Sequence, residues 1–377
     1  MLEIAYVDPQ SYHNLSIYDK GMLCQMDSSK IVLFGCDKWD CDPPNALLKK
    51  WFKYNKKKNK ISKGLSYIFS IVRIANYIKR RKIKIIHIQW VRIFPIDYYF
   101  LLWLRYNKIK VVYTAHNILP HNSGNKYKRA FNNYYNKVDY ICVHSERTKQ
   151  ELTEQFNIPI HKISVIPHGI INYNNNDENI QIRSEELKTL HNIKSSDIIF
   201  SSLGIQSFYK GIDIIIDVWA STPQLFNNGN IKLMLVGKNK DIDYSKVINI
   251  DNVIIINESV SNLDFQSYLN ISNIILLPYR KISQSGVLFS AINSNKPVII
   301  SDIGGLTDPL KIGNIGWNIG SPNPINLKKK LLDIINNPVE YNNMNESEEE
   351  FIKIKDYYSW TRISKCLKSF YDSILNR

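Results

Sequence analysis

The chain has 377 residues, 44% of them hydrophobic, which suits two domains with a cleft between them better than a single core. No stretch of roughly 20 apolar residues is free of charge, and Met1 leads directly into a strand-like segment, so we expect neither a membrane-spanning helix nor a secretory leader. Lysine and arginine outnumber aspartate and glutamate by 49 to 34, and this formal charge of +15 favours phosphates, nucleic acid or anionic lipid as partners without choosing among them.

In the first half of the chain, short apolar runs rich in isoleucine and valine alternate with longer helix-like segments. This alternation is typical of parallel sheets with helices on both faces. Strands are predicted at 3–7, 30–34, 83–88, 110–115, 139–143 and 162–166, and helices at 64–82, 97–107, 125–137 and 145–155. Basic residues crowd between Lys49 and Lys110, and the lysines from Lys49 to Lys63 are interleaved with Trp51 and Phe52.

An asparagine-rich stretch at 172–179 interrupts the alternation, which then restarts, and we place a domain boundary there. In the second half, strands are predicted at 198–203, 232–236, 252–256, 273–277 and 298–301, and helices at 211–220, 262–270, 285–294, 324–337 and 359–375. The sequence therefore predicts an α/β fold of two Rossmann-like parallel-sheet domains, 1–171 and 180–356. Ligands of such sheets bind beyond the carboxyl ends of the strands.

Two loops of the second half carry the residue types that bind phosphates. In the first, Gly204 follows a strand and Lys210 precedes a helix, so the lysine ammonium can balance the charge of a leaving diphosphate. In the second, a helix opens at Gln284, Ser285 and Gly286, and the free N–H groups of a helix N-terminus attract anions. Each has an ordinary alternative, a solvated lysine and a simple helix cap.

Histidines at 87, 116, 121, 144 and 168 lie at or near predicted strand ends. A structural role is the usual one for a single histidine, but the strand-end position and the Thr-Ala-His-Asn context favour an active-site role for His116. The histidine spacing does not indicate a zinc site, and the five scattered cysteines lack a C-x-x-C pair. We expect no metal and no cofactor.

The chain resembles the retaining nucleotide-sugar glycosyltransferases of family 4, which have the GT-B fold, from about Ile83 to Trp360. In the first half the shared motifs are His-Ile-Gln-Trp at 87–90, Thr-Ala-His-Asn at 114–117, Val-His-Ser-Glu at 143–146 and Pro-His-Gly at 167–169. In the second half they are Tyr-Lys-Gly at 209–211, Leu-Val-Gly at 235–237, Leu-Pro-Tyr-Arg at 277–280, Ser-Gly-Val at 285–287, Lys-Pro-Val at 296–298 and Asp-Ile-Gly-Gly at 302–305.

The resemblance implies roles for individual residues. It assigns His116 to the transferred sugar and Lys210 to the donor diphosphate, and we expect these two to be the catalytic residues. The donor site would comprise Gly204, Lys210, Glu258, Arg280, Gln284, Ser285, Gly286, Val287 and Ser290, with Glu258 near the nucleobase. The acceptor side would comprise Tyr12, His13, Asn14 and His121. The final helix, 359–377, would return to the first domain.

The sequence departs from the family at two points. The E-x7-E motif of many members is missing, because residues 283–290 contain no carboxylate and Ser290 stands at the position of the second glutamate. A serine there can hydrogen-bond a ribose hydroxyl, but more weakly than a carboxylate can. The arginine that accompanies the phosphate lysine is also missing, and Arg280 is a possible substitute. We interpret the chain as a branch of the family.

The expected function is transfer of a hexose from a UDP or GDP sugar to a glycan or lipid-linked acceptor in cell-surface polysaccharide synthesis. Retention is expected, with positioning and electrostatic stabilisation as the mechanism. The alternatives are an inactive binding scaffold with the same fold and a nucleic-acid-binding protein, and we expect no nucleic acid as a partner.

A cytoplasmic protein held peripherally on the anionic inner membrane face is also expected. The aromatic and basic segments 51–63 and 98–105 are the predicted contacts with lipid. The alternative interpretation makes 98–104 a core helix and the lysines a solvated face.

Overall fold

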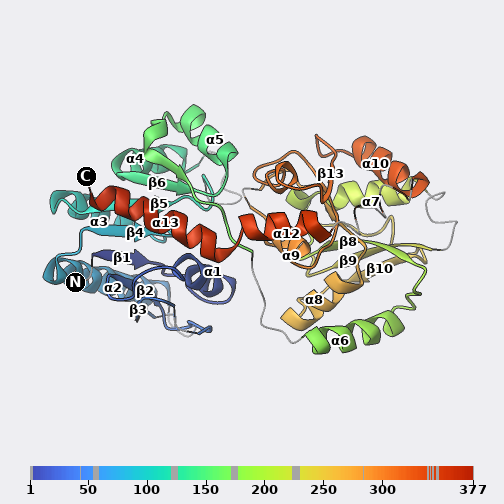
Figure 1. Ribbon diagram of the computed structural model, residues 1–377, viewed down its shortest axis with the longest axis horizontal. Helices are drawn as coiled ribbons and strands as arrows, with labels where there is room; N and C mark the ends of the chain where they lie inside the picture. The colour runs from blue at the N-terminus through green and yellow to red at the C-terminus, as the bar shows by residue number, and fades with distance from the viewer. Residues whose placement is uncertain are drawn as a thin grey trace. The chain divides into compact units, whose positions relative to one another are not determined.

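The computed structural model describes residues 3–42, 44–53, 59–119, 126–170, 177–222, 230–282, 284–337, 339, 341, 344 and 348–376. The chain divides into two compact α/β units (Figure 1). Unit 1 is Met1–Gly169 with Tyr358–Arg377, and unit 2 is Ile170–Tyr357. Each contains a parallel sheet, so the predicted fold class is confirmed. Within these residues no helix has both the length and the apolarity needed to cross a bilayer.

Unit 1 has a seven-stranded parallel sheet in the order β3-β2-β1-β4-β5-β6-β7. Its strands are β1 (Ile4–Val7), β2 (Ile31–Cys36), β3 (Leu47–Phe52), β4 (Ile85–Ile88), β5 (Lys110–Thr114), β6 (Tyr140–Val143) and β7 (Ile163–Val165). Its helices are α1 (Asn14–Met22), α2 (Lys60–Arg81), α3 (Phe94–Tyr106), α4 (Lys128–Lys137), α5 (Glu146–Phe156) and α13 (Trp360–Leu375). The strand order reverses between β1 and β4, and that switch point is where such sheets bind ligands.

Alternate residues of the unit 1 strands feed two separate cores, one on each face of the sheet. In β1, Ala5 and Val7 pack on one face with residues of α2, α3, α4 and α5. Ile4 and Tyr6 pack on the other face with residues of α1 and α13. The helix that ends the chain therefore belongs to the core of unit 1.

Helix α13 packs against the rest of unit 1 through Trp360, whose side chain occupies space left by two glycines. A Cβ atom at Gly21 or Gly169 would lie 2.2 or 2.4 Å from Cδ2 of Trp360. Farther along the helix, Tyr371 Oη lies 2.5 Å from Nδ1 of the buried His87, whose Nε2 is 2.7 Å from Thr114 Oγ1. His87 is thus a structural histidine.

Parts of the two predicted lipid-contact segments are used within unit 1, whereas residues 54–58 lie outside the described residues. Residues 47–52 form β3, which pairs in parallel with β2. Trp51 packs against Phe34 at 4.8 Å between ring centroids, and the Arg73 guanidinium covers it at 4.0 Å. In α3, Leu101 and Leu104 are fully buried. Trp51 and most of the segment 98–105 therefore pack in the protein core. Burial of apolar side chains in the core is favourable, as burial in lipid would be.

Unit 2 has a six-stranded parallel sheet in the order β10-β9-β8-β11-β12-β13. Its strands are β8 (Ile198–Leu203), β9 (Ile231–Val236), β10 (Val253–Ile256), β11 (Ile274–Leu277), β12 (Val298–Ile300) and β13 (Gly316–Asn318). Its helices are α6 (Asp177–Leu190), α7 (Ile212–Ala220), α8 (Asn262–Ile271), α9 (Gly286–Asn293), α10 (Pro324–Asn336) and α12 (Glu348–Tyr357). The order reverses between β8 and β11, which makes the loops after these strands the candidate ligand site.

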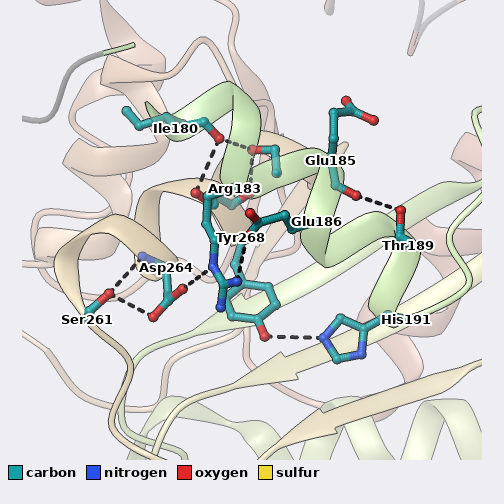
Figure 2. Close-up of polar contacts among 11 residues, drawn as sticks. Ile180, Arg183, Glu185, Glu186, Thr189, His191, Ser261, Asp264 and Tyr268 are labelled. Atoms are coloured by element: carbon teal, nitrogen blue, oxygen red, sulfur yellow. Dashed lines mark hydrogen bonds and ion pairs between the residues drawn. The ribbon is translucent and has the colours of Figure 1, made fainter. Parts of the chain in front are cut away.

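Helix α6 begins inside the stretch that the sequence placed in a linker, and it packs on α8 (Figure 2). Arg183 bridges the two helices, since its guanidinium lies 2.7 Å from both Glu186 and Asp264. Asp264 is itself fixed by the N-cap of α8, where Ser261 accepts the Asp264 N–H. The prediction of a break up to residue 179 was therefore wrong at its end, because polar contacts with α8 stabilise a helix of low hydrophobicity.

Candidate functional site

Lys210 lies at the switch point of unit 2, at the end of the 3₁₀ turn Phe208–Lys210 after β8. Its side chain is buried, with Nζ 5.6 Å from the centroid of the Tyr279 ring. Burial alone lowers the pKa of Lys210 to about 8, and no carboxylate pairs with the ammonium in the described part of the chain. A buried cation without a counter-charge is costly, so the site favours an anionic ligand.

Gly204 brings the end of β8 close to both phosphate-type loops. Its φ of +89° is unfavourable for a side chain, and a Cβ there would lie 3.0 Å from Lys210 Nζ and 3.6 Å from Val287 Cγ2. The predicted donor residues Gly204, Lys210 and Val287 are therefore neighbours in space.

Helix α9 begins beside this lysine. Ser285 is its N-cap and accepts the Leu288 N–H at 3.2 Å. A Cβ at Gly286 would meet no atom within 4 Å, so the first turn has open space beside it. Gln284 precedes the cap and is half-buried. The positive end of the helix dipole and the Lys210 ammonium thus act on the same region.

Arg280 is held by a carboxylate. Its Nη1 and Nη2 each donate to one oxygen of Asp213 at 2.6 Å, and the guanidinium covers the Phe208 ring at 4.0 Å. Through Phe208, Arg280 fixes the loop that carries Lys210. Because Asp213 balances the charge of Arg280, the positive charge of the site that has no counter-charge is that of Lys210.

Ser290 and Glu258 differ in what they offer a ligand. Ser290 is buried, and its hydroxyl donates to the Gly286 carbonyl oxygen at 2.9 Å. Its hydrogen is therefore already used within α9, which leaves only its lone pairs for a ribose. Glu258 follows β10 and is exposed.

His116, at the end of β5 in unit 1, is held on three sides. The Trp90 ring stacks on it at 4.3 Å with an angle of 7° between the planes. Its Nε2 lies 3.0 Å from Gln89 Oε1, and its Nδ1 lies 3.3 Å from His144 Nε2. Gln89 and Trp90 come directly after β4, so the residues that orient His116 come from the switch point of the sheet.

The hydrogen bonds of this group fix the tautomers of both histidines. His144 Nδ1 must carry a hydrogen, because its partner at 2.8 Å is the Ile166 carbonyl oxygen. Burial lowers the pKa of His144 to about 4, so its ring is neutral and Nε2 accepts from His116 Nδ1. His116 Nε2 then needs a hydrogen-bond donor. A rotation of the Gln89 side-chain amide by about 180°, which exchanges its oxygen and nitrogen, supplies one. That rotation also gives a partner to the buried Gln89 Nε2, which otherwise has none in the described chain.

His168, after β7, packs its ring against Tyr18 with 5.1 Å between ring centroids. Burial lowers the pKa of His168 to about 3 and that of His116 well below its usual value. Both rings are therefore neutral near neutral pH. Within the described ranges no group of three or more His, Cys, Asp or Glu side chains is arranged to hold a metal ion.

Two carboxyl groups beside the switch point of unit 1 escaped the sequence analysis. Asp8 follows β1 and Asp19 lies in α1, and both are fully buried. Asp8 Oδ1 accepts the Gln10 N–H at 2.5 Å, and Asp19 Oδ1 accepts the Tyr6 hydroxyl at 2.9 Å. Burial raises the pKa of Asp8 to about 7, and the pKa of Asp19 is raised by burial and by Asp8. Because burial disfavours the charged form of both groups, the folded protein holds a proton on this carboxyl pair at pH values where the unfolded chain has released it.

The predicted acceptor residues lie near this pair along the chain. Tyr12 is half-buried, and the exposed His13 has a φ of 53° and an Nδ1 that lies 2.8 Å from Asp40 Oδ2. Asn14 begins α1, and nothing of its side chain is described. His121 lies outside the described residues. A polar residue directly after the first strand was the signal that could have found Asp8.

The chain matches two families of known proteins, one in each unit. Residues 32–171 match Glycosyltransferase Family 4, and residues 183–351 match Glycosyl transferases group 1. Each half of the chain is therefore similar to a family of glycosyltransferase domains. A curated relative, an uncharacterised glycosyltransferase of Methanocaldococcus jannaschii, is 24% identical over 174 residues. Those residues are 44% of this chain and 45% of the relative, so the match spans less than half of that protein.

Solved structures with the same fold cover 99 to 100% of this chain. Sucrose-phosphate synthase of Thermosynechococcus elongatus has a TM-score of 0.70 and 14% identity, with 100% of both chains covered. HepE of Anabaena in complex with UDP has a TM-score of 0.70 and 12% identity, with 99% of this chain and 100% of that one covered. A glycosyltransferase of Rickettsia africae has a TM-score of 0.70 and 16% identity, with 99% and 98% covered. The fold is that of GT-B glycosyltransferases.

Proposed function

We propose that this chain is an enzyme that moves a hexose from a nucleotide diphosphate sugar to a glycan or lipid-linked acceptor. The observation that carries the proposal is the buried ammonium of Lys210, which has no carboxylate partner in the described chain and lies at the switch point beside α9. A bound diphosphate would supply the missing counter-charge. UDP is the first nucleotide to test, since a structural relative was solved with UDP and with UDP-glucose, and GDP is the alternative.

Within this proposal the chain acts by position and by charge. Lys210 and the free N–H groups at the start of α9 bind the diphosphate, and their attraction grows as negative charge develops on the leaving group. Residues 283–290 contain no carboxylate that could act as a nucleophile. Transfer with retention, without a metal, therefore relies on holding donor and acceptor in the reactive geometry, and His116 is assigned to the sugar.

The acceptor and the place of action belong to the same proposal. The carboxyl edge of the unit 1 sheet, with the Asp8–Asp19 pair and Tyr12, is the proposed acceptor side. The basic excess supports a peripheral position on an anionic inner membrane face, where lipid-linked acceptors for cell-surface polysaccharide would be met.

An inactive binding scaffold is the second candidate, and the missing glutamates favour it. A panel of UDP and GDP sugars separates the two functions when donor binding is followed by calorimetry and release of nucleotide diphosphate is followed by a coupled assay. The enzyme proposal expects both binding and release for at least one donor. Binding without release, in the presence of a glycan acceptor extract, would favour the scaffold. Binding of neither UDP nor GDP would refute both functions.

A further inference from the structure

Helix α2 leaves an apolar stripe uncovered on its outer side. The residues of this α2 stripe are between 41 and 75% exposed: Ile61, Leu65, Ile68, Phe69 and Val72. The opposite side of the same helix is buried in the core of unit 1 through Tyr67, Ile71, Ile74 and Ile78. A helix that is apolar on both sides is normally covered on both sides, and the described part of unit 1 covers only one.

The spacing of the stripe makes it a continuous surface. Its members are separated by three or four residues, apart from the adjacent Ile68 and Phe69, so they lie over one another along one side of a helix. One and two turns beyond Val72, the exposed residues on that side become polar and then basic, at Asn76, Lys79 and Arg80. The surface is therefore apolar for most of its length and cationic at its end.

The charge around α2 identifies the kind of partner. Residues 43–96 contain eleven lysines and four arginines and no aspartate or glutamate. This equals the whole formal charge of +15, so the rest of the chain is neutral. A second copy of the chain on the stripe would bring two such segments together, which like-charge repulsion opposes. An anionic lipid bilayer has an apolar interior beneath negatively charged headgroups. It therefore matches both the apolar stripe and the basic residues of α2.

We propose that the α2 stripe docks unit 1 on an anionic lipid surface. The apolar side chains enter the headgroup region, and the exposed basic residues at the end of α2, Lys79 and Arg80, meet lipid phosphates. The inference names the surface for the membrane position proposed above, and it does not depend on sugar transfer. It also replaces Trp51 and α3, whose apolar side chains are largely used within unit 1.

Vesicle flotation with a matched pair of variants tests the proposal. One variant carries Ile61→Ser and Leu65→Ser in the stripe. The control carries Ile182→Ser and Leu190→Ser on α6 of unit 2, where the exposed fractions are 54 and 66%. The parent should bind vesicles of phosphatidylcholine with phosphatidylglycerol better than phosphatidylcholine alone, and less as salt rises. The stripe variant should bind about tenfold more weakly, or worse, while the control binds as the parent does.

Melting curves of both variants check that the exposed substitutions leave the fold intact. The proposal is overturned if the stripe variant floats with anionic vesicles as the parent does, or if the parent shows no preference for phosphatidylglycerol. A parent that is dimeric by light scattering, and monomeric only in the stripe variant, would assign the stripe to a second copy. UDP and GDP titrations on the same samples keep the two proposals apart, since a parent that floats but binds neither nucleotide contradicts only the donor site.

Discussion

The side chain of Lys210 is buried, and burial disfavours its charged form. This burial lowers the pKa of Lys210 to about 8. The same lysine in the unfolded chain keeps a pKa of about 10.4. Between these two pH values the unfolded chain binds the proton that the folded protein lacks, so stability rises with pH through this window. Below it, the ligand-free folded protein carries the full cost of the buried cation.

Lys210→Met should therefore stabilise the ligand-free protein at neutral pH, by about 1 to 3 kcal/mol in the free energy of unfolding. Methionine keeps an unbranched side chain of similar reach against the Tyr279 ring. Denaturant unfolding at several pH values measures the gain, which should shrink as pH rises above 8 towards the usual pKa of lysine. A variant that is less stable than the parent at neutral pH would mean that the ammonium has a compensating partner.

The Asp8–Asp19 pair predicts a pH dependence of opposite sign. The pKa of Asp8 rises from its usual 3.8 to about 7, so the folded state keeps a proton that the unfolded chain releases. The stability from this group is complete below pH 3.8 and is lost as pH rises to 7. Asp8→Asn should therefore gain stability relative to the parent across that window, by at most about 1.4 kcal/mol per pH unit. Urea unfolding of both proteins, compared at each pH, cancels the titration of the histidines. A constant difference would contradict a protonated Asp8.

Elements with a clear apolar period were predictable, whereas those stabilised by tertiary contacts were not. The segment 47–52 lacks the two-residue alternation of a half-buried strand, and β3 forms at the sheet edge with β2 as its neighbour. Its lysines suit an edge strand, since charge discourages pairing with another chain. Helix α6 has a weak apolar face and depends on Arg183 and on α8.

The two candidate phosphate loops could be picked out of the sequence because each lies within one short stretch, at Gly204 to Lys210 and at Ser285 to Val287. Their role in donor binding stays a prediction. Asp8 follows β1, Asp19 lies in α1 and Gln89 follows β4, and the pairing of β1 with β4 brings these strand ends together. A sequence without a predicted strand order cannot reveal such a group.

The packing of α13 gives a prediction at the scale of one element. In Gly169→Ala the new methyl group would lie 2.4 Å from Trp360 Cδ2, which forces the indole or the helix to move. The variant should lose about 1 to 3 kcal/mol of unfolding free energy, the usual cost of overpacking. Gly64→Ala in α2 is the matched control, since a Cβ there meets no atom within 4 Å, and its helix propensity should make it neutral or stabilising.

Thermal and urea unfolding measure both changes. Adding Trp360→Ala to Gly169→Ala should make the glycine substitution nearly neutral, because the clash is then gone. An unchanged cost of Gly169→Ala in the Trp360→Ala background would show that the glycine is needed for some other reason.

At the scale of the whole molecule, both units share a parallel sheet with one reversal of strand order, but the residues near that reversal differ in charge. Each sheet reverses its strand order once. The candidate residues of unit 2 follow the strands at that point, whereas in unit 1 Asp8 and Gln89 do so and the histidines follow the next strands, β5 to β7. Unit 2 presents a cation and a helix N-terminus at its switch point, whereas unit 1 presents a buried carboxyl pair with raised pKa values there and neutral histidines after the neighbouring strands. The excess charge of the chain lies outside both groups, in residues 43–96.

Turnover of Lys210→Ala under saturating donor tests the account most directly. The donor is the one found in the nucleotide-sugar panel, and Lys296→Ala is the control, a mostly buried lysine of unit 2 whose Nζ donates to the Asn270 carbonyl oxygen. If Lys210 stabilises the leaving diphosphate, its loss should cost roughly 2 to 4 kcal/mol in the transition state and lower turnover about 30-fold or more, with a smaller loss of donor affinity. Lys296→Ala should turn over as the parent does. Sugar transfer by Lys210→Ala at the parent rate would contradict the assignment of this site to the donor phosphates.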